Sequence, residues 1–270
     1  MKFLDPINQT QLFGLEKFIS EFIKLDKKGV FPNQILLSGQ KGLGKSTLAL
    51  HFINYILSKD EPFKYDISNF KIDAQNQSFK TILNKSNPNF NLIDITSEKK
   101  NIDLNQIREL ISNLNKSSFN NKPRFVLIDN VEFLNINSVN ALLKTLEEPS
   151  INVFFILINN NKKLLSTITS RCINFKITLN NDENLNIANK LLNGNLYEKI
   201  NKDLINYYST AGNIYNLYKF AQTNDLDICK LNLKDFLKIL IRENYYKKND
   251  FMKYFIFDFV EYYFIKKNFS

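Results

Sequence analysis

The stretch Gly39-Gln40-Lys41-Gly42-Leu43-Gly44-Lys45-Ser46-Thr47 decides the fold of this chain. It holds three of the seven glycines of a 270-residue protein within six positions. Its spacing matches G-x-x-x-x-G-K-[ST], a loop whose backbone N–H groups surround phosphate oxygens. Glycine permits this close approach because it carries no side chain. The stretch therefore predicts a phosphate-binding loop.

The flanking residues support this prediction. Residues 34–38 are typical of a short buried strand, and residues 46–57 have the apolar spacing of a helix, whose positive end favours an anion. In such a loop Lys45 is expected to reach the β- and γ-phosphates of ATP, and the Ser46 hydroxyl to hold Mg²⁺. Two alternatives remain: an ordinary glycine turn, and a retained loop without catalytic activity. The other nucleotide-binding candidates in the loop are Gly39, Gly42, Gly44 and Thr47.

Further elements follow from hydrophobic patterning. Strands are predicted at residues 91–96, 124–129, 153–158 and 172–177, and helices at 12–25, at 102–114 and from 137 to just before Pro149. Continuous apolar strands that alternate with helices indicate an α/β fold, a parallel sheet flanked by helices. The strand signal disappears after residue 178. We therefore predict a nucleotide-binding domain at 1–178, a small helical lid-type domain at 179–222 and a short C-terminal helical region at 223–270.

The composition excludes several classes of protein. A net charge of +9 is compatible with a nucleic-acid partner, but the lysines are scattered and only four arginines occur, so charge alone decides nothing. Two distant cysteines and one histidine cannot build a four-ligand zinc site or a disulfide framework, which suits a reducing cytoplasm. The longest aliphatic runs are of strand length, so we expect no membrane span.

A second signature of phosphate-loop proteins is a hydrophobic strand that ends in an aspartate. Asp129 follows four apolar residues, and at the carboxyl end of a parallel strand it is expected to hold Mg²⁺ through water. The alternative for Asp129 is a simple strand-end cap. Hydrolytic relatives of this fold place a glutamate next, which polarises the attacking water. Here the next residue is Asn130, and an amide cannot act as a base. Glu132 is expected to face elsewhere if the strand continues.

Two further positions are candidates. Asn159 and Asn160 follow the next strand, where a polar side chain senses a γ-phosphate, although Asn is also an ordinary turn residue. Arg171 lies between Ser170 and Cys172 just before the last strand, a position that an arginine finger acting on a neighbouring subunit's nucleotide requires. The alternative for Arg171 is a structural ion pair with a carboxylate.

These residues together resemble a known family. The chain from about residue 12 to 177 resembles bacterial clamp-loader AAA+ subunits of DNA polymerase III, and the pairing of an LLKTLEEP segment with a later SRC segment is highly specific to that family. The resemblance implies an AAA+ P-loop domain followed by small all-helical domains. It also implies partners, namely the gamma/tau and delta subunits, and through the complex the sliding clamp and primed DNA. The resemblance rests on residues 142–149, 154–159, 164–168 and 170–172.

Within that family the residues favour the delta-prime group over the ATP-hydrolysing gamma/tau group. The chain lacks the four zinc-binding cysteines of gamma/tau, has Asn130 where gamma/tau has glutamate, and carries no sensor arginine in residues 211–216. The resemblance thus implies an accessory subunit that supplies Arg171 in trans and has little or no ATP hydrolysis of its own. A gamma/tau-type motor is the alternative. A third alternative is an unrelated nucleotide kinase that uses the same loop. Such a kinase would need a substrate-binding lid and several arginines to bind phosphates, which this sequence does not supply. In this family a third, helical domain forms a collar that joins the subunits into a ring. Only about 45 C-terminal residues remain for it here, which is short for such a domain.

Overall fold

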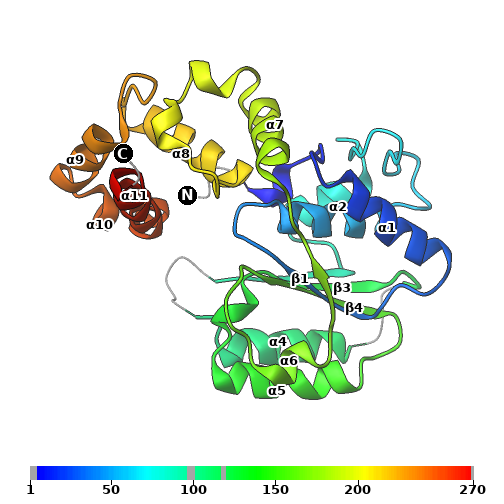
Figure 1. The fold of residues 1–270 in the computed structure, drawn as a ribbon. Coiled ribbons are helices and arrows are strands. Elements are labelled where there is room, and N and C mark those ends of the chain that lie inside the picture. The colour runs from blue at the N-terminus through cyan, green and yellow to red at the C-terminus, as the bar shows by residue number, and fades with distance from the viewer. Residues whose placement is uncertain (1–4, 96–100, 117–119, 269–270) are drawn as a thin grey trace. The chain divides into compact units, whose positions relative to one another are not determined.

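The computed structural model describes residues 5–95, 101–116 and 120–268 (Figure 1). Thr96, the last residue of one predicted strand, and the extreme termini of the predicted domains lie outside these residues. The chain divides into two compact units, one formed by Asp5–Thr178 and one that begins at Leu179. Each unit is described by itself.

The first unit is built on a five-stranded sheet with the order β2-β3-β4-β1-β5. All four strand pairings are parallel, and Leu36 lies opposite Leu157 in the central pair. The predicted α/β fold class is therefore confirmed. The strands are β1 (Gln34–Ser38), β2 (Phe90–Ile93), β3 (Arg124–Ile128), β4 (Val153–Asn159) and β5 (Ile173–Lys176).

Helices cover both faces of this sheet, as continuous apolar strands require. Figure 1 shows α1 and α2 on one face and α4, α5 and α6 on the other. The predicted helices are confirmed, with boundaries shifted by a few residues at most. The helices of this unit are α1 (Glu16–Lys27), α2 (Lys45–Leu57), α3 (Gln77–Leu83), α4 (Leu104–Leu114), α5 (Ile136–Glu147) and α6 (Ser166–Thr169), with short 3-10 turns η1 (Pro6–Asn8) and η2 (Val131–Phe133).

Each face of the sheet has its own core. On the α1 and α2 face, the rings of Phe22 and Phe52 pack edge to face at 5.5 Å, and Phe125 of β3 lies 6.5 Å from Phe52. On the other face, α4 and α5 bury their apolar stripes against Val126 and Leu157. The sheet is thus held on both sides, and its carboxyl edge, where the parallel strands end, presents the loops that carry the candidate residues.

The second unit is entirely helical among its described residues. Polar side chains start its helices: Asn180, Thr210 and Asn232 each accept a hydrogen bond from a backbone N–H of the first turn. The rings of Phe236 and Phe259 pack edge to face at 5.3 Å and join two of the helices. The elements are α7 (Asn181–Leu192), η3 (Leu196–Glu198), η4 (Lys202–Leu204), α8 (Ala211–Thr223), α9 (Leu233–Arg242), α10 (Tyr245–Lys248) and α11 (Asp250–Asn268).

In the part of the chain that the structure describes, no helix has the length and apolar character needed to span a membrane.

His51, the sole histidine of the chain, is completely buried on α2. Its Nε2 lies 3.1 Å from the carbonyl oxygen of Gln9, and its Nδ1 lies 3.0 Å from the hydroxyl oxygen of Tyr65. A carbonyl oxygen only accepts, so Nε2 carries the proton and Nδ1 accepts from the Tyr65 hydroxyl. Burial lowers the pKa of His51 from 6.5 to about 4. The imidazole is therefore neutral in the folded protein.

This burial predicts a loss of stability in mild acid. Between pH 6.5 and about 4 the unfolded chain binds a proton at His51 that the folded chain does not bind, so the free energy of unfolding falls as the pH falls. The full contribution is on the order of 3 kcal/mol. Urea titrations from pH 7.5 to 4 should show a shallower decline for His51→Gln than for the native chain. Identical pH dependence in the two proteins would contradict the assignment.

Candidate nucleotide-binding site

The glycine loop connects the end of β1 to the start of α2. Gly39, Gly42 and Gly44 all have positive φ angles, of 154°, 90° and 85°. A Cβ added at Gly39 would lie 2.4 Å from the carbonyl oxygen of Ile177, so a side chain there would collide with backbone. The N-cap residue of α2 is Gly44, which has no side chain to cap the first turn. The left-handed glycines and the glycine N-cap are the backbone features expected of a phosphate-binding loop.

Lys45 is the first residue of α2 and is only 3% exposed. Its ammonium donates hydrogen bonds to the carbonyl oxygens of Gly39 at 2.9 Å and Gln40 at 2.6 Å, and to Oδ1 of Asn160 at 3.0 Å. Burial lowers the pKa of Lys45 to about 8, and the carboxylates of Asp129 and Glu132 oppose this effect. The ammonium is therefore still charged at pH 7 and faces the loop.

Ser46 and Asp129 meet across the carboxyl edge of the sheet. The Ser46 hydroxyl donates to Oδ2 of Asp129 at 2.8 Å. The two residues come from α2 and from the turn after β3, and they meet because β1 and β3 both end at this edge. A hydroxyl and a carboxylate so placed are oxygen ligands of the kind that Mg²⁺ takes. The residues present thus fit a magnesium ion bound together with nucleotide phosphates.

The two asparagines at the end of β4 have different contacts. Asn159 is 7% exposed, and its side chain is bonded within its own turn, to the carbonyl oxygen and the N–H of Lys162 at 2.9 and 3.0 Å. Asn160 instead places its amide oxygen 3.0 Å from the Lys45 ammonium. Thr47 lies half-buried in the first turn of α2. Asn160 is therefore the residue of this pair that touches the phosphate loop.

The turn after Asp129 brings a second carboxylate to the site. Strand β3 ends at Ile128, and Asn130 adopts a left-handed conformation with φ 59°, which reverses the chain into η2. Glu132 of η2 consequently accepts a hydrogen bond from the Asn160 amide at 3.0 Å. The expectation that Glu132 faces elsewhere was conditional on a continuing strand, and that condition is wrong. The signal in the sequence was Asn130 itself, because Asn tolerates left-handed backbone.

Both the NH₂ group and the oxygen of the Asn130 side chain form hydrogen bonds. Its Nδ2 donates to Oδ1 of Asp94 at 2.7 Å, and its Oδ1 accepts from Nδ2 of Asn160 at 2.9 Å. A carboxylate at position 130 could not donate to Asp94 and would meet it with like charge. Both ends of the Asn130 amide are therefore hydrogen-bonded in this structure, at the position where a hydrolytic relative is expected to have a glutamate.

Arg171 lies away from this chain's own phosphate loop. It follows α6 and precedes β5, whose residue Ile173 pairs with Ile35 at the beginning of β1, whereas the loop follows the end of β1. Its Nη1 donates to the carbonyl oxygen of Thr167 at 2.8 Å, and its Nη2 forms an ion pair with Glu147. The Nε atom is buried without a hydrogen-bond partner in the described structure. The intrachain ion pair considered from the sequence is thus present.

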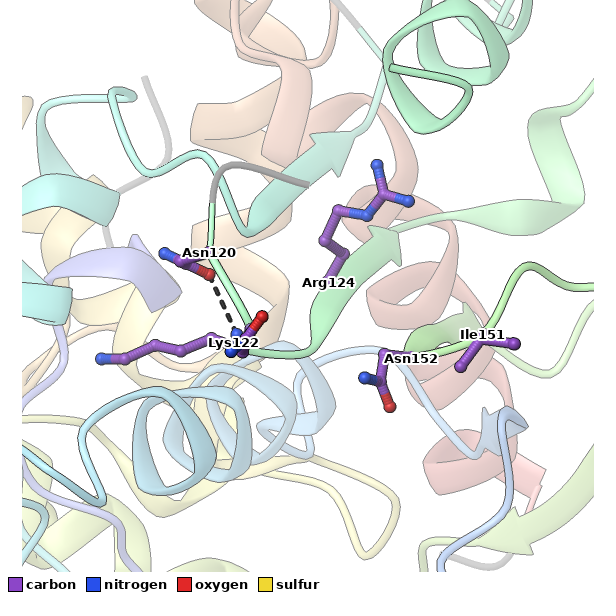
Figure 2. Close-up of a pocket in the computed structure, with 6 residues that line it drawn as sticks. Asn120, Lys122, Arg124, Ile151 and Asn152 are labelled. Carbon is purple, nitrogen blue, oxygen red and sulfur yellow. Dashed lines mark hydrogen bonds between the residues drawn. The ribbon is translucent and has the colours of Figure 1, made fainter. Parts of the chain in front are cut away.

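A separate pocket of about 220 Å³ lies at the opposite edge of the sheet, where β3 and β4 begin (Figure 2). Within it the backbone N–H of Lys122 donates to Oδ1 of Asn120 at 3.0 Å. Arg124 is turned to a backbone acceptor, the carbonyl oxygen of Lys116, at 3.1 Å. The pocket therefore belongs to the amino edge of the sheet and not to the phosphate loop. It is lined by Asn120, Asn121, Lys122, Arg124, Ile151 and Asn152.

Comparison with known proteins gives this arrangement a family. The chain is 30% identical over 171 residues to DNA polymerase III subunit gamma/tau of Mycoplasma genitalium, an alignment that covers 63% of this chain and 27% of that protein. It is 30% identical over 224 residues to DNA polymerase III subunit gamma of Buchnera aphidicola subsp. Schizaphis graminum, covering 80% of this chain and 58% of the relative. It is 28% identical over 265 residues to subunit delta' of the same organism, covering 92% and 76%.

The chain spans 27% and 58% of the length of the first two of these relatives. A family model described as DNA polymerase III, delta subunit, matches residues 14–181, which is more than half of the chain. That match includes the phosphate loop, Asp129 and Arg171. The chain belongs to this family of DNA polymerase III clamp-loader subunits.

Proposed function

We propose that this chain is a delta-prime-type subunit of the DNA polymerase III clamp loader, which helps to load the sliding clamp onto primed DNA in the cytoplasm. Its partners are the gamma/tau and delta subunits, and through them the clamp and DNA. The observation that carries the choice of delta-prime is Asn130, which follows Asp129 and is bonded as an amide to Asp94. The subunit is accordingly an accessory one with little or no ATP hydrolysis of its own.

The same proposal includes binding of ATP with Mg²⁺ at the glycine loop. Lys45 and the loop amides would hold the phosphates, with Gly39, Gly42 and Gly44 allowing the close approach. Ser46 and Asp129, which lie 2.8 Å apart, would hold the ion, and Mg²⁺ when bound neutralises phosphate charge. Thr47 continues the loop into α2. At the end of β4, Asn159 shapes the turn that presents Asn160 toward Lys45.

Weak hydrolysis follows from the chemistry at position 130. Attack of water on a γ-phosphate is helped by a carboxylate that orients the water and accepts its proton. The Asn130 amide is not basic, and both of its ends are already bonded, to Asp94 and Asn160. The gamma/tau-type motor remains the second candidate, and the observation in its favour is the Glu132 carboxylate, which lies 3.0 Å from the Asn160 amide.

Arg171 is proposed as an arginine finger that acts on the nucleotide of a neighbouring subunit. It lies at the opposite end of β1 and β5 from this chain's own loop, so it cannot serve that loop. We also propose that residues 179–222 act as a small lid-type domain and residues 223–270 as a short collar-like region. The exposed side chains of Phe257 and Phe264 on α11 support a packing surface in that region.

Purified chain is expected to turn over ATP far more slowly than about 1 s⁻¹, the lower end of typical enzyme rates. The measurement is phosphate release with Mg²⁺, and Lys45→Ala serves as the control for a contaminating ATPase. Turnover at an ordinary enzymatic rate that Lys45→Ala abolishes would favour the motor over the accessory subunit.

A further inference from the structure

The carboxylate of Glu132 contacts Asn160 at two atoms. Its Oε1 accepts from the side-chain Nδ2 of Asn160 at 3.0 Å, and its Oε2 lies 3.4 Å from the backbone nitrogen of the same residue. A carboxylate is well suited to this role because both of its oxygens accept hydrogen bonds. The contact joins the turn after β3 to the turn after β4.

The contact with Glu132 helps to determine the orientation of the Asn160 side-chain amide. Nδ2 lies between two acceptors, Oδ1 of Asn130 at 2.9 Å and Oε1 of Glu132. Oδ1 therefore points to the opposite side, where it accepts from the Lys45 ammonium at 3.0 Å. A flipped amide would place its NH₂ group against an ammonium and its oxygen against two oxygens. The orientation is thus set by hydrogen-bonding chemistry and not by packing alone.

We propose that Glu132 is a positioning residue of the terminal-phosphate subsite: it holds Asn160 so that the amide oxygen of Asn160 faces Lys45. The proposal rests on the nucleotide binding proposed above. Lys45 of such a loop reaches the β- and γ-phosphates, so a group fixed against its ammonium at the tip of β4 adjoins the terminal phosphate. Glu132 acts through Asn160 and does not itself touch the nucleotide.

Two effects of removing Glu132 have opposite signs. If Glu132 positions Asn160, its loss frees the amide and weakens the binding of ATP more than that of ADP. If Glu132 acts by its charge directly on the nucleotide, its loss removes a repulsion and strengthens ATP binding. Glu132→Gln separates the two effects because it removes the charge but keeps one acceptor oxygen for the Asn160 amide.

The test is a double-mutant cycle on dissociation constants for ATP and ADP with Mg²⁺, measured by competition with a fluorescent nucleotide. Glu132→Ala is expected to weaken ATP binding about five- to tenfold and to change ADP binding less than about twofold, the effect of one lost hydrogen bond. In an Asn160→Ala background the same change should cause no further loss. Glu132→Gln should retain part of the affinity. Glu109→Ala, an exposed carboxylate on α4, is the matched control.

Three results would overturn the proposal: equal effects on ATP and ADP, tighter ATP binding, or losses that add in the double variant. Native protein that binds neither nucleotide would instead refute the nucleotide binding proposed above. The positioning role is then decided by ¹H–¹⁵N spectra of the nucleotide-free chain, with the Asn160 side-chain signal assigned from its absence in Asn160→Ala. That signal should shift in Glu132→Ala and not in Glu109→Ala, and an unshifted signal would refute the positioning role. Circular dichroism verifies that each variant is folded.

Discussion

Arg171→Ala is expected to lower ATP hydrolysis and clamp loading by a loader reconstituted with this subunit, while the isolated chain stays folded and still joins the complex. A guanidinium aimed at a neighbour's nucleotide stabilises charge on the transferring phosphoryl group, and such fingers are worth roughly 10³–10⁵ in rate. The effect on the whole complex should be smaller, because other sites keep their own fingers. The fold should survive because the lost ion pair with Glu147 is partly exposed and such pairs contribute little.

Two variants separate the trans role from a local one. Arg171→Lys should rescue poorly, because lysine lacks the planar fork of arginine. Glu147→Gln removes the local ion pair and leaves the guanidinium in place, so it should not reproduce the loss caused by Arg171→Ala. The readouts are phosphate release and clamp loading on primed DNA. An Arg171→Ala subunit that assembles and loads clamps at the native rate would make Arg171 purely structural.

Lys45→Ala is expected to raise the dissociation constant for ATP by about 10- to 100-fold, the effect of losing a charge-assisted hydrogen bond. Lys45 is buried, and its ammonium already faces the loop through the carbonyl oxygens of Gly39 and Gln40. Lys41→Ala changes an exposed lysine of the same loop and is the matched control. Fluorescent-nucleotide titration of both variants gives the comparison. An unchanged constant in Lys45→Ala would show that the loop takes no part in nucleotide binding.

The three central strands of the sheet, β1, β3 and β4, were predictable because they are buried on both faces. Residues 125–128 and 153–158 are uninterrupted apolar runs, and each run lies within a strand of the structure. Helix starts were less predictable: residues 12–15 have apolar spacing, but α1 begins only at Glu16. Gly14, at φ 72°, interrupts the helical backbone there, which a spacing pattern does not reveal.

Some residues of the candidate site were also predictable from the sequence, and others were not. Lys45, Ser46 and Asp129 were found from spacing because the loop motif is local, and because a carboxylate directly after a parallel strand must lie at the carboxyl edge. Glu132 was missed because its position depends on one left-handed residue, Asn130. The choice between Asn159 and Asn160 was equally open, since neighbouring residues of a turn point in different directions.

The amino-acid sequence by itself determined the phosphate loop, the order of strands and helices along the chain, and the amide at position 130 that argues against a motor. These features are local, and each is set by spacing or by residue chemistry. Only the tertiary structure decided that the Asn130 amide is hydrogen-bonded to Asp94 and Asn160, and that Glu132 accepts a hydrogen bond from Asn160. It also decided that Arg171 lies at the opposite end of β1 from the loop. The contacts of Asn130 and Glu132 join residues that follow separate strands, and they form only once the parallel strands have paired and brought their carboxyl ends together; the same pairing places Arg171 at the other end of β1.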